Sequence, residues 1–145
     1  VSGKCRCTPE AAQRYQDRVS GPLLDRIDIQ LAVAAMPAES IGARAEGEAS
    51  SLVAERVARA HAIQLARQGK PNQQLAPRDI DRHCRPDAAG ERLLRAAMQQ
   101  LHWSARAYHR VLKVARTIAD LAGAEHVAAG HVAEAIQYRR ALREQ

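Results

Sequence analysis

The chain of 145 residues is long enough to bury the core of one domain but not of two, and its 22 Lys and Arg against 16 Asp and Glu give a formal net charge of +6. It contains no Phe, one Trp and three Tyr, although 46% of its residues are hydrophobic. Because alanine dominates this apolar fraction, the composition favours closely packed helices and argues against a β-sandwich or a β-barrel.

The N-terminal part predicts one helix and one strand. Thr8 is a suitable N-cap and Pro9 suits the first helical position, so a helix is expected over 9–19, ending at Ser20-Gly21-Pro22. Residues 27–33 begin with alternating apolar and polar side chains, as in a half-buried strand. Because a lone strand is not stable, we expect its partner strands to lie outside this chain.

The remaining sequence predicts an all-α bundle of four or five helices. From residue 36 to 47 the chain is rich in Ala, Gly and Glu without a clear period, which is typical of a flexible connection. From Ser51 onward, apolar periodicity and capping residues predict helices over 51–68, 77–84, from Asp87 to 101, over 104–122 and from His131 onward. In the first of these, the apolar side is expected to consist of Leu52, Val53, Val57, Ala60 and Ile63. We therefore divide the chain into an N-terminal piece, a linker and a helical domain, over 1–35, 36–50 and 51–145.

The helix predicted over 104–122 has a cationic and an apolar face. At about 100° per residue, Arg110 and Lys113 fall within about 40° of Arg106, and Arg116 lies at the edge of the same ridge. The opposite face is expected to pack against the bundle through Tyr108, Val111, Leu112, Ala115, Ile118, Ala119 and Ala122. A cationic ridge is most often a solvated surface, but convergent arginines also suit phosphate recognition. The pattern alone leaves both interpretations open.

Several motifs resemble a known family. The family is the magnesium-chelatase and MCM-like branch of AAA+ ATPases. Its segment after sensor 1 is similar to Ser20-Gly21-Pro22-Leu23-Leu24-Asp25-Arg26-Ile27-Asp28. Its sensor 2 helix is similar to Ser104-Ala105-Arg106-Ala107-Tyr108-His109-Arg110. Within this branch, the ComM or YifB family also resembles Cys5-Arg6-Cys7-Thr8-Pro9 and the stretch 131–139. The resemblance covers nearly the whole chain, more loosely over 36–47 and 71–87.

The resemblance implies the lid and inter-subunit portion of a ring-forming, usually hexameric ATPase that uses ATP and Mg²⁺. Arg26 would be the arginine finger, which stabilises the charge that builds up on the γ-phosphate during phosphoryl transfer. Asp25 would orient Arg26 or cap a turn. Arg106 would be sensor 2, reading the γ-phosphate of its own subunit or of the neighbour, and Arg110 is a further candidate contact to the nucleotide.

The resemblance also implies partners for the chain. These are its own AAA+ core, the neighbouring subunits of a homo-hexamer, and DNA, because motors of this family are associated with branch migration during recombination and transformation. True chelatase subunits instead drive Mg²⁺ insertion into a porphyrin, and a lid of such a subunit is the alternative within the family.

Two parts that ATP binding requires are absent from the sequence. It contains no G-x-x-x-x-G-K-[ST] phosphate loop and no strand ending in an acidic pair that would hold Mg²⁺. We therefore expect a C-terminal fragment of a longer ATPase, with residues 27–33 paired to the missing sheet. Alone, the chain is expected to hold no cofactor and to hydrolyse no ATP.

The three cysteines form no disulfide-scaffold pattern, so a reducing, cytoplasmic setting is expected. Cys5 and Cys7 form a Cys-x-Cys, which would need a second pair upstream to complete a zinc site. His131 and Glu134 share a helical face, but without further ligands a helix cap or a surface polar pair is the favoured interpretation. No apolar run approaches the ~20 residues of a membrane span, so no membrane contact is expected.

Two other classes of function stay open. A stand-alone nucleic-acid-binding module would use the positive charge and the cationic ridge for phosphate contacts, although the sequence has neither interleaved aromatic residues nor a clear helix-turn-helix pattern. An adaptor bundle would only bind partner proteins and would need no nucleotide.

Overall fold

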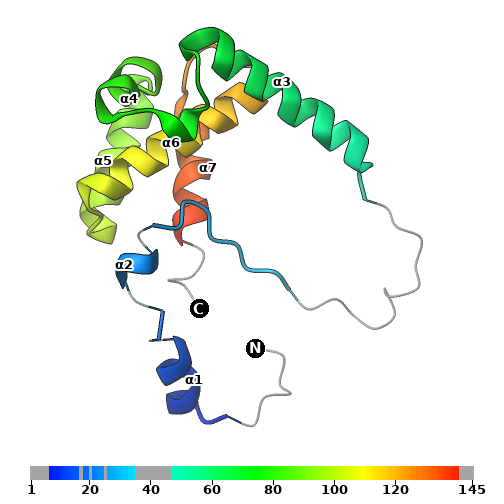
Figure 1. Ribbon diagram of the computed structural model, residues 1–145. Helices are drawn as coiled ribbons and strands as arrows, with labels where there is room; N and C mark the ends of the chain where they lie inside the picture. The colour runs from blue at the N-terminus through cyan, green and yellow to red at the C-terminus, as the bar shows by residue number, and fades with distance from the viewer. Residues whose placement is uncertain (1–6, 17, 20, 25, 35–46, 141–145) are drawn as a thin grey trace.

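The computed structural model describes residues 7–16, 18–19, 21–24, 26–34 and 47–140, which form helices and an irregular segment over 26–34 (Figure 1). These are α1 (Pro9–Gln16), α2 (Gly21–Leu24), α3 (Ser50–Gln68), the 3₁₀ helix η2 (Asn72–Gln74), α4 (Pro77–His83), α5 (Ala88–Leu101), α6 (Ala105–Leu121) and α7 (Ala129–Arg140). Among these residues the strand pairing is one isolated bridge between Pro86 and Val127, and no sheet forms. The predicted all-α architecture is confirmed. None of the described helices combines the length and the apolar character needed to cross a membrane.

Capping residues set several helix ends where the sequence predicted them. At the start of α5, Asp87 Oδ1 accepts the Gly90 N–H at 2.6 Å, and at the start of α6, Ser104 Oγ accepts the Ala107 N–H at 3.3 Å. After α3, Gly69 adopts the left-handed backbone conformation with φ of +71°, and its N–H closes the last turn of the helix. The starts of α5 and α6 and the end of α3 are therefore encoded locally.

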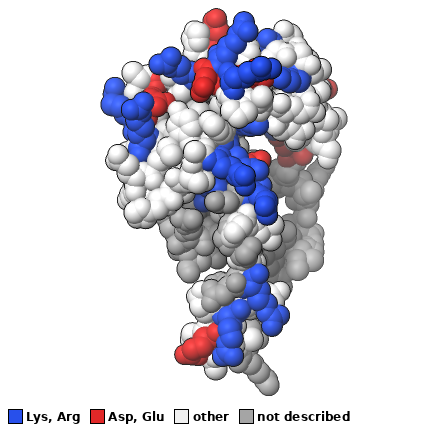
Figure 2. All heavy atoms as spheres, turned by 60° about the vertical axis from the view of Figure 1, so that its left-hand side comes forward, with Lys and Arg blue, Asp and Glu red and all other residues white. Residues whose placement is uncertain are grey.

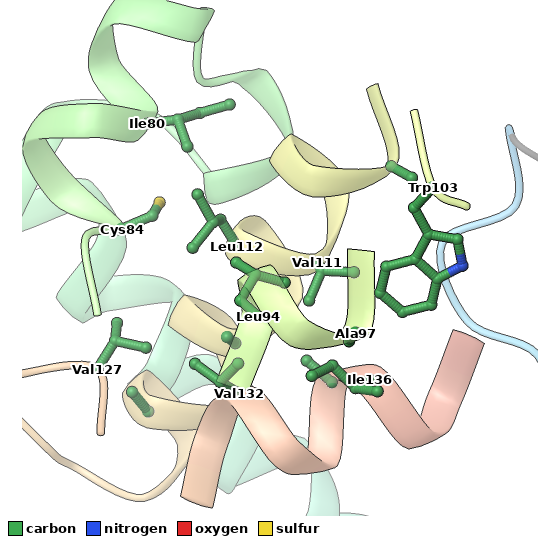
Figure 3. Packing of buried hydrophobic residues seen from close by; sticks show 14 of the residues in the cluster. Ile80, Cys84, Leu94, Ala97, Trp103, Val111, Leu112, Val127, Val132 and Ile136 are labelled. Carbon is green, nitrogen blue, oxygen red and sulfur yellow. The ribbon is translucent and has the colours of Figure 1, made fainter. Parts of the chain in front are cut away.

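Helix α6 is the centre of the bundle. It packs against α3, η2, α4 and α7, while α5 packs against α7. Alanines on the inner face of α6 let the neighbouring helices approach closely, and its larger apolar side chains interlock with theirs (Figure 3). The core comprises Leu75, Ile80, Cys84, Leu94, Ala97, Trp103, Ala107, Val111, Leu112, Ala115, Ala119, Val127, Val132, Ala135 and Ile136.

Two predicted apolar faces are less buried than expected. On α6, Val111, Leu112, Ala115 and Ala119 are buried and Tyr108 and Ile118 are half-buried, but Ala122 lies beyond the last helical residue and is exposed. On α3, Ala60 is buried, whereas the other four predicted residues are 37–55% exposed. The first half of α3 projects away from the bundle, so no described element covers its apolar side chains (Figure 1).

The N-terminal prediction is confirmed only in part. Helix α1 begins at Pro9, where Thr8 Oγ1 accepts the Ala11 N–H at 3.3 Å, but it ends at Gln16, and the predicted stop at 20–22 instead overlaps the start of α2. The predicted strand over 27–33 does not form with any described residue. Its expected partner strands lie outside this chain. Among the described residues, its backbone contacts α7 through Ile27 and Gln30, and the Asp28 side chain pairs with Arg110 of α6.

Gly90 lies where α5 closely approaches its neighbours. A Cβ at this position would lie 3.0 Å from the Pro86 Cβ and 3.1 Å from the Val132 Cγ2. We expect Gly90→Ala to lower the free energy of unfolding by about 1 kcal/mol, because overpacking outweighs the better helix propensity of alanine. Gly130→Ala is the matched control, because Gly130 lies in the first turn of α7 and a Cβ there would meet open space. The free energy of unfolding of this variant should be equal to or higher than that of the parent. Urea denaturation measures both variants, and equal stabilities would contradict the prediction.

Candidate functional site

The segment 26–30 lies against α6 and α7, beside the C-terminal half of α7 in Figure 1. The Arg26 carbonyl accepts a hydrogen bond from Arg110 Nη1 at 2.7 Å, and the Asp28 carboxylate forms an ion pair with the same nitrogen. The Gln30 N–H donates to the Tyr138 carbonyl at 2.7 Å. The backbone of Arg26 is therefore held by the bundle, while Arg26 itself is exposed.

Arg106 lies in the first turn of α6 and is exposed. Within the described part of the chain, its guanidinium has no hydrogen bond or ion pair. The positive end of the α6 dipole adds to its charge. This end of α6 is therefore suited to receive an anion.

The other members of the predicted cationic ridge are engaged within the chain. The Arg110 side chain is 28% exposed and is paired with Asp28, and Lys113 Nζ donates to the Gln73 carbonyl at 3.0 Å. The structure thus brings Arg110 and the Arg26 backbone together, and it leaves Arg106 as the ridge member without a partner among the described residues.

Arg116 is not on the ridge, and its predicted position there is wrong. Its side chain is 3% exposed, and its Nη2 lies 2.9 Å from Asp120 Oδ1. Arg67 of α3 contacts the same carboxylate at 2.5 Å, and Asn72 Nδ2 donates to Asp120 Oδ2 at 2.9 Å. Burial alone would raise the pKa of the Asp120 carboxyl, but these hydrogen bonds and the two arginine charges hold that pKa below its ordinary value. The buried carboxylate draws Arg116 inward because one turn of helix separates them.

A cleft of about 840 Å³, which we call the α6 cleft, opens beside the charged face of α6. Arg106, Arg110 and Lys113 contribute its cationic lining, and Asp28 and Ile29 of the 26–30 segment also line it. Its apolar lining comes mainly from α6, with smaller contributions from α4 and from Ile29 and Leu31. This volume is within the range of small-molecule sites, and the cleft places Arg106 and the segment that carries Arg26 around one space.

Basic side chains do not form a continuous band on the face drawn in Figure 2. Lys and Arg gather there in several groups separated by uncharged surface, and Asp or Glu lie among some of them. A nucleic-acid-binding module typically carries its Lys and Arg as one patch or stripe. This face therefore does not favour the stand-alone DNA-binding interpretation.

The two described cysteines differ in their surroundings. Cys5 and Asp25 lie outside the described residues, and Cys7 is exposed. Cys84 is fully buried, and this burial raises the pKa of its thiol to about 11, so the thiol stays protonated at neutral pH. In the described ranges, no three or more His, Cys, Asp or Glu side chains gather as metal ligands.

His131 and Glu134 serve the helix that carries them. His131 Nδ1 accepts the Ala128 N–H at 3.0 Å, which caps the start of α7. Glu134 Oε1 accepts the Tyr138 hydroxyl at 2.9 Å, one turn later. The helix-cap interpretation is confirmed for His131, whereas the polar pair that Glu134 forms is with Tyr138.

Asp28 and Arg139 hold the 26–30 segment but were not predicted to do so. Arg139 is 4% exposed, its guanidinium lies 5.8 Å from the centre of the Trp103 ring, and its Nη1 donates to the Ile27 carbonyl at 3.2 Å. Sequence reasoning placed Asp28 on the polar side of a strand. The available signal was its negative charge, which complements the cationic ridge on the later helix.

Comparison with known proteins gives two family matches and several close relatives. The family described as "Magnesium chelatase, subunit ChlI C-terminal" matches residues 47–139, and "Magnesium chelatase, subunit ChlI" matches residues 1–41. Competence protein ComM of Haemophilus influenzae is 41% identical over 139 residues, which is 95% of this chain and 27% of that protein. The YifB proteins of Salmonella typhimurium and Escherichia coli are 42% and 38% identical over 135 residues, or 92% of this chain and 27% of each relative. The chain thus spans about a quarter of the length of these relatives.

Proposed function

The chain belongs to the magnesium-chelatase-like family of ComM and YifB, and from this premise we propose that it works as the helical lid of an AAA+ ATPase. In this proposal Arg26 is the arginine finger that reaches a neighbouring subunit's nucleotide, and Arg106 is sensor 2. One observation carries it: the exposed Arg106 lies on the helix whose Arg110 holds the backbone of Arg26. Arg106 lines the α6 cleft, and the segment that carries Arg26 contributes Asp28 and Ile29 to the same lining.

The proposed cofactor of the longer protein is ATP with Mg²⁺. A guanidinium suits a terminal phosphate because its N–H groups form a planar fork that matches phosphate oxygens and stays charged at every physiological pH. During phosphoryl transfer, charge spreads over the γ-phosphate oxygens, and a positioned arginine stabilises it. We assign the phosphate loop and the Mg²⁺ ligands to the rest of the protein, in keeping with relatives about four times as long as this chain.

We further propose that the assembly is a homo-hexamer in which this chain contacts its own AAA+ core and a neighbouring subunit, and that it acts on DNA. The support for DNA is the net charge of +6 and the 41% identity to a protein named for competence. The lid of a true magnesium chelatase subunit is the alternative, in keeping with the name of the matching family. Stimulation of ATP hydrolysis by DNA, measured in the full-length protein, separates the two.

The test of the lid assignment is Arg106→Ala in the full-length protein. The sensor 2 guanidinium would donate hydrogen bonds to phosphate oxygens whose negative charge grows in the transition state. We therefore expect kcat for ATP hydrolysis to fall by about 100-fold. Arg95→Ala is the matched control, because Arg95 is 73% exposed on α5 and pairs only with Glu91 one turn earlier among the described residues. The control should hydrolyse ATP at the unchanged rate.

Two results would contradict the lid assignment. One is an Arg106→Ala protein that hydrolyses ATP as fast as the Arg95→Ala control. The other is salt-dependent binding of short DNA by these 145 residues that Arg106→Ala leaves unchanged, which would favour the stand-alone nucleic-acid-binding module.

A further inference from the structure

The 26–30 segment is seated on the bundle although it has no secondary structure of its own. Gln30 is 8% exposed, whereas the other described residues from 26 to 34 are exposed. The Gln30 N–H donates to the Tyr138 carbonyl at 2.7 Å, in the last described turn of α7. The segment therefore takes its conformation from contacts with α6 and α7.

Arg110 makes the contact nearest to Arg26. Its Nη1 carries two N–H groups, and it both donates to the Arg26 carbonyl at 2.7 Å and pairs with the Asp28 carboxylate. The Arg110 guanidinium thus binds the residues on both sides of Ile27. A lysine has a single point charge on a flexible stem and could not hold two acceptors in the same fixed geometry.

Arg139 secures the segment from the other helix. It is 4% exposed, it stacks near the buried Trp103, and its Nη1 donates to the Ile27 carbonyl at 3.2 Å. Since Trp103 belongs to the core, this anchor is fixed to the rigid part of the bundle. Consecutive carbonyls, those of Arg26 and Ile27, are therefore held by arginines from two different helices.

We propose that Arg110 is a positioning residue for Arg26, which couples the arginine finger to the helix that carries sensor 2. This inference rests on the proposed function. Arg106 and Arg110 are four residues apart on α6 and are neighbours on one face of the helix. A movement of α6 that follows the state of the nucleotide at Arg106 would therefore displace the Arg26 backbone as well. The Asp28 charge already compensates Arg110, so we assign Arg110 this role in place of direct contact with the nucleotide.

A double-mutant cycle in the full-length protein, read out as the rate of ATP hydrolysis, tests the coupling of Arg110 to Arg26. Because a misplacement of about 1 Å in a catalytic group costs about 100-fold in rate, we expect Arg110→Ala to lower kcat by about 10- to 100-fold with KM for ATP unchanged. In an Arg26→Ala background, Arg110→Ala should cause no further loss, since there is then no finger to misplace. A loss of equal size in both backgrounds would overturn the proposal and would assign Arg110 to the nucleotide itself.

Hydrogen exchange in the same protein gives a readout that does not depend on hydrolysis. Arg110→Ala should speed amide exchange over residues 26–30 by about tenfold while exchange in α5 and α7 stays as in the parent. Arg95→Ala should change neither. Unaltered exchange over 26–30 in Arg110→Ala would overturn the proposal. If Arg26→Ala leaves hydrolysis unchanged but Arg110→Ala speeds this exchange, the finger assignment fails, while the anchoring of the segment stands.

Discussion

Replacing Arg26 with alanine in the full-length protein should lower kcat for ATP hydrolysis by about 10³- to 10⁵-fold. The loss is large because the guanidinium acts on charge that exists mainly in the transition state, so ATP binding should change far less than the rate. Arg18→Ala is the matched control. Arg18 is exposed and lies 5.9 Å from the centre of the Tyr15 ring, away from the 26–30 segment along the chain. The control should keep its activity and its assembly state.

A mixing experiment tests whether Arg26 acts on the neighbouring subunit. An Arg26→Ala subunit keeps its nucleotide site but lacks a finger, and a subunit with a disabled phosphate loop keeps its finger but binds no nucleotide. Mixed rings of the two should regain hydrolysis at the interfaces where the intact parts meet. Hydrolysis by Arg26→Ala alone at the parent rate, with assembly intact, would remove the finger assignment. Failure of the mixture to regain activity would show that the arginine serves its own subunit.

The helices of the bundle could be predicted because their determinants are local. Asp87 and Ser104 start α5 and α6 through bonds to N–H groups three residues later, and the apolar face of α6 repeats with the period of the helix that it forms. Arg26 and Arg106 were candidates for a different reason: they lie in motifs that resemble a family, and no spacing within this chain would have singled them out.

The contacts that shape the candidate site could not be predicted, because they join residues far apart in the sequence. Arg110 and Asp28 are separated by 82 positions, and no periodic pattern pairs them. The burial of Arg116 depends on Asp120 together with Arg67, which lies 53 residues before that carboxylate. A helical wheel places Arg116 at the edge of the polar face and carries no information on which helix packs there.

Asp120 should be the most costly polar residue of the bundle to replace. Its side chain is fully buried between Arg67 and Arg116, and it accepts a further hydrogen bond from Asn72. Asp120→Asn keeps the shape of the side chain but leaves the Arg67 and Arg116 guanidiniums without a negative partner at this position. We expect the free energy of unfolding to fall by about 3–5 kcal/mol. Urea denaturation near neutral pH measures this loss.

Two matched variants separate the buried charge from a general effect of the substitution. Glu55→Gln removes a carboxylate that is 65% exposed and lies 3.9 Å from Arg59, and it should cost less than about 1 kcal/mol. Asp120→Asn combined with Arg116→Met removes one of the two uncompensated cations and should recover part of the stability. A loss below about 1 kcal/mol in Asp120→Asn would contradict a stabilising role of this network, in which Arg67 of α3 contacts the Asp120 carboxylate of α6.

The pH dependence of stability provides an independent test of the same carboxylate. Because the pKa of Asp120 is lowered in the folded state, its contribution is fully present above the unfolded pKa of about 3.8 and is lost as the pH falls from there through the lower folded value. The parent should therefore lose stability on acidification more steeply than Asp120→Asn, which has no proton to bind at this position. Parallel curves of unfolding free energy against pH for the two proteins below pH 4 would mean that Asp120 titrates alike in the folded and unfolded chain. That result would conflict with its contacts to Arg67 and Arg116.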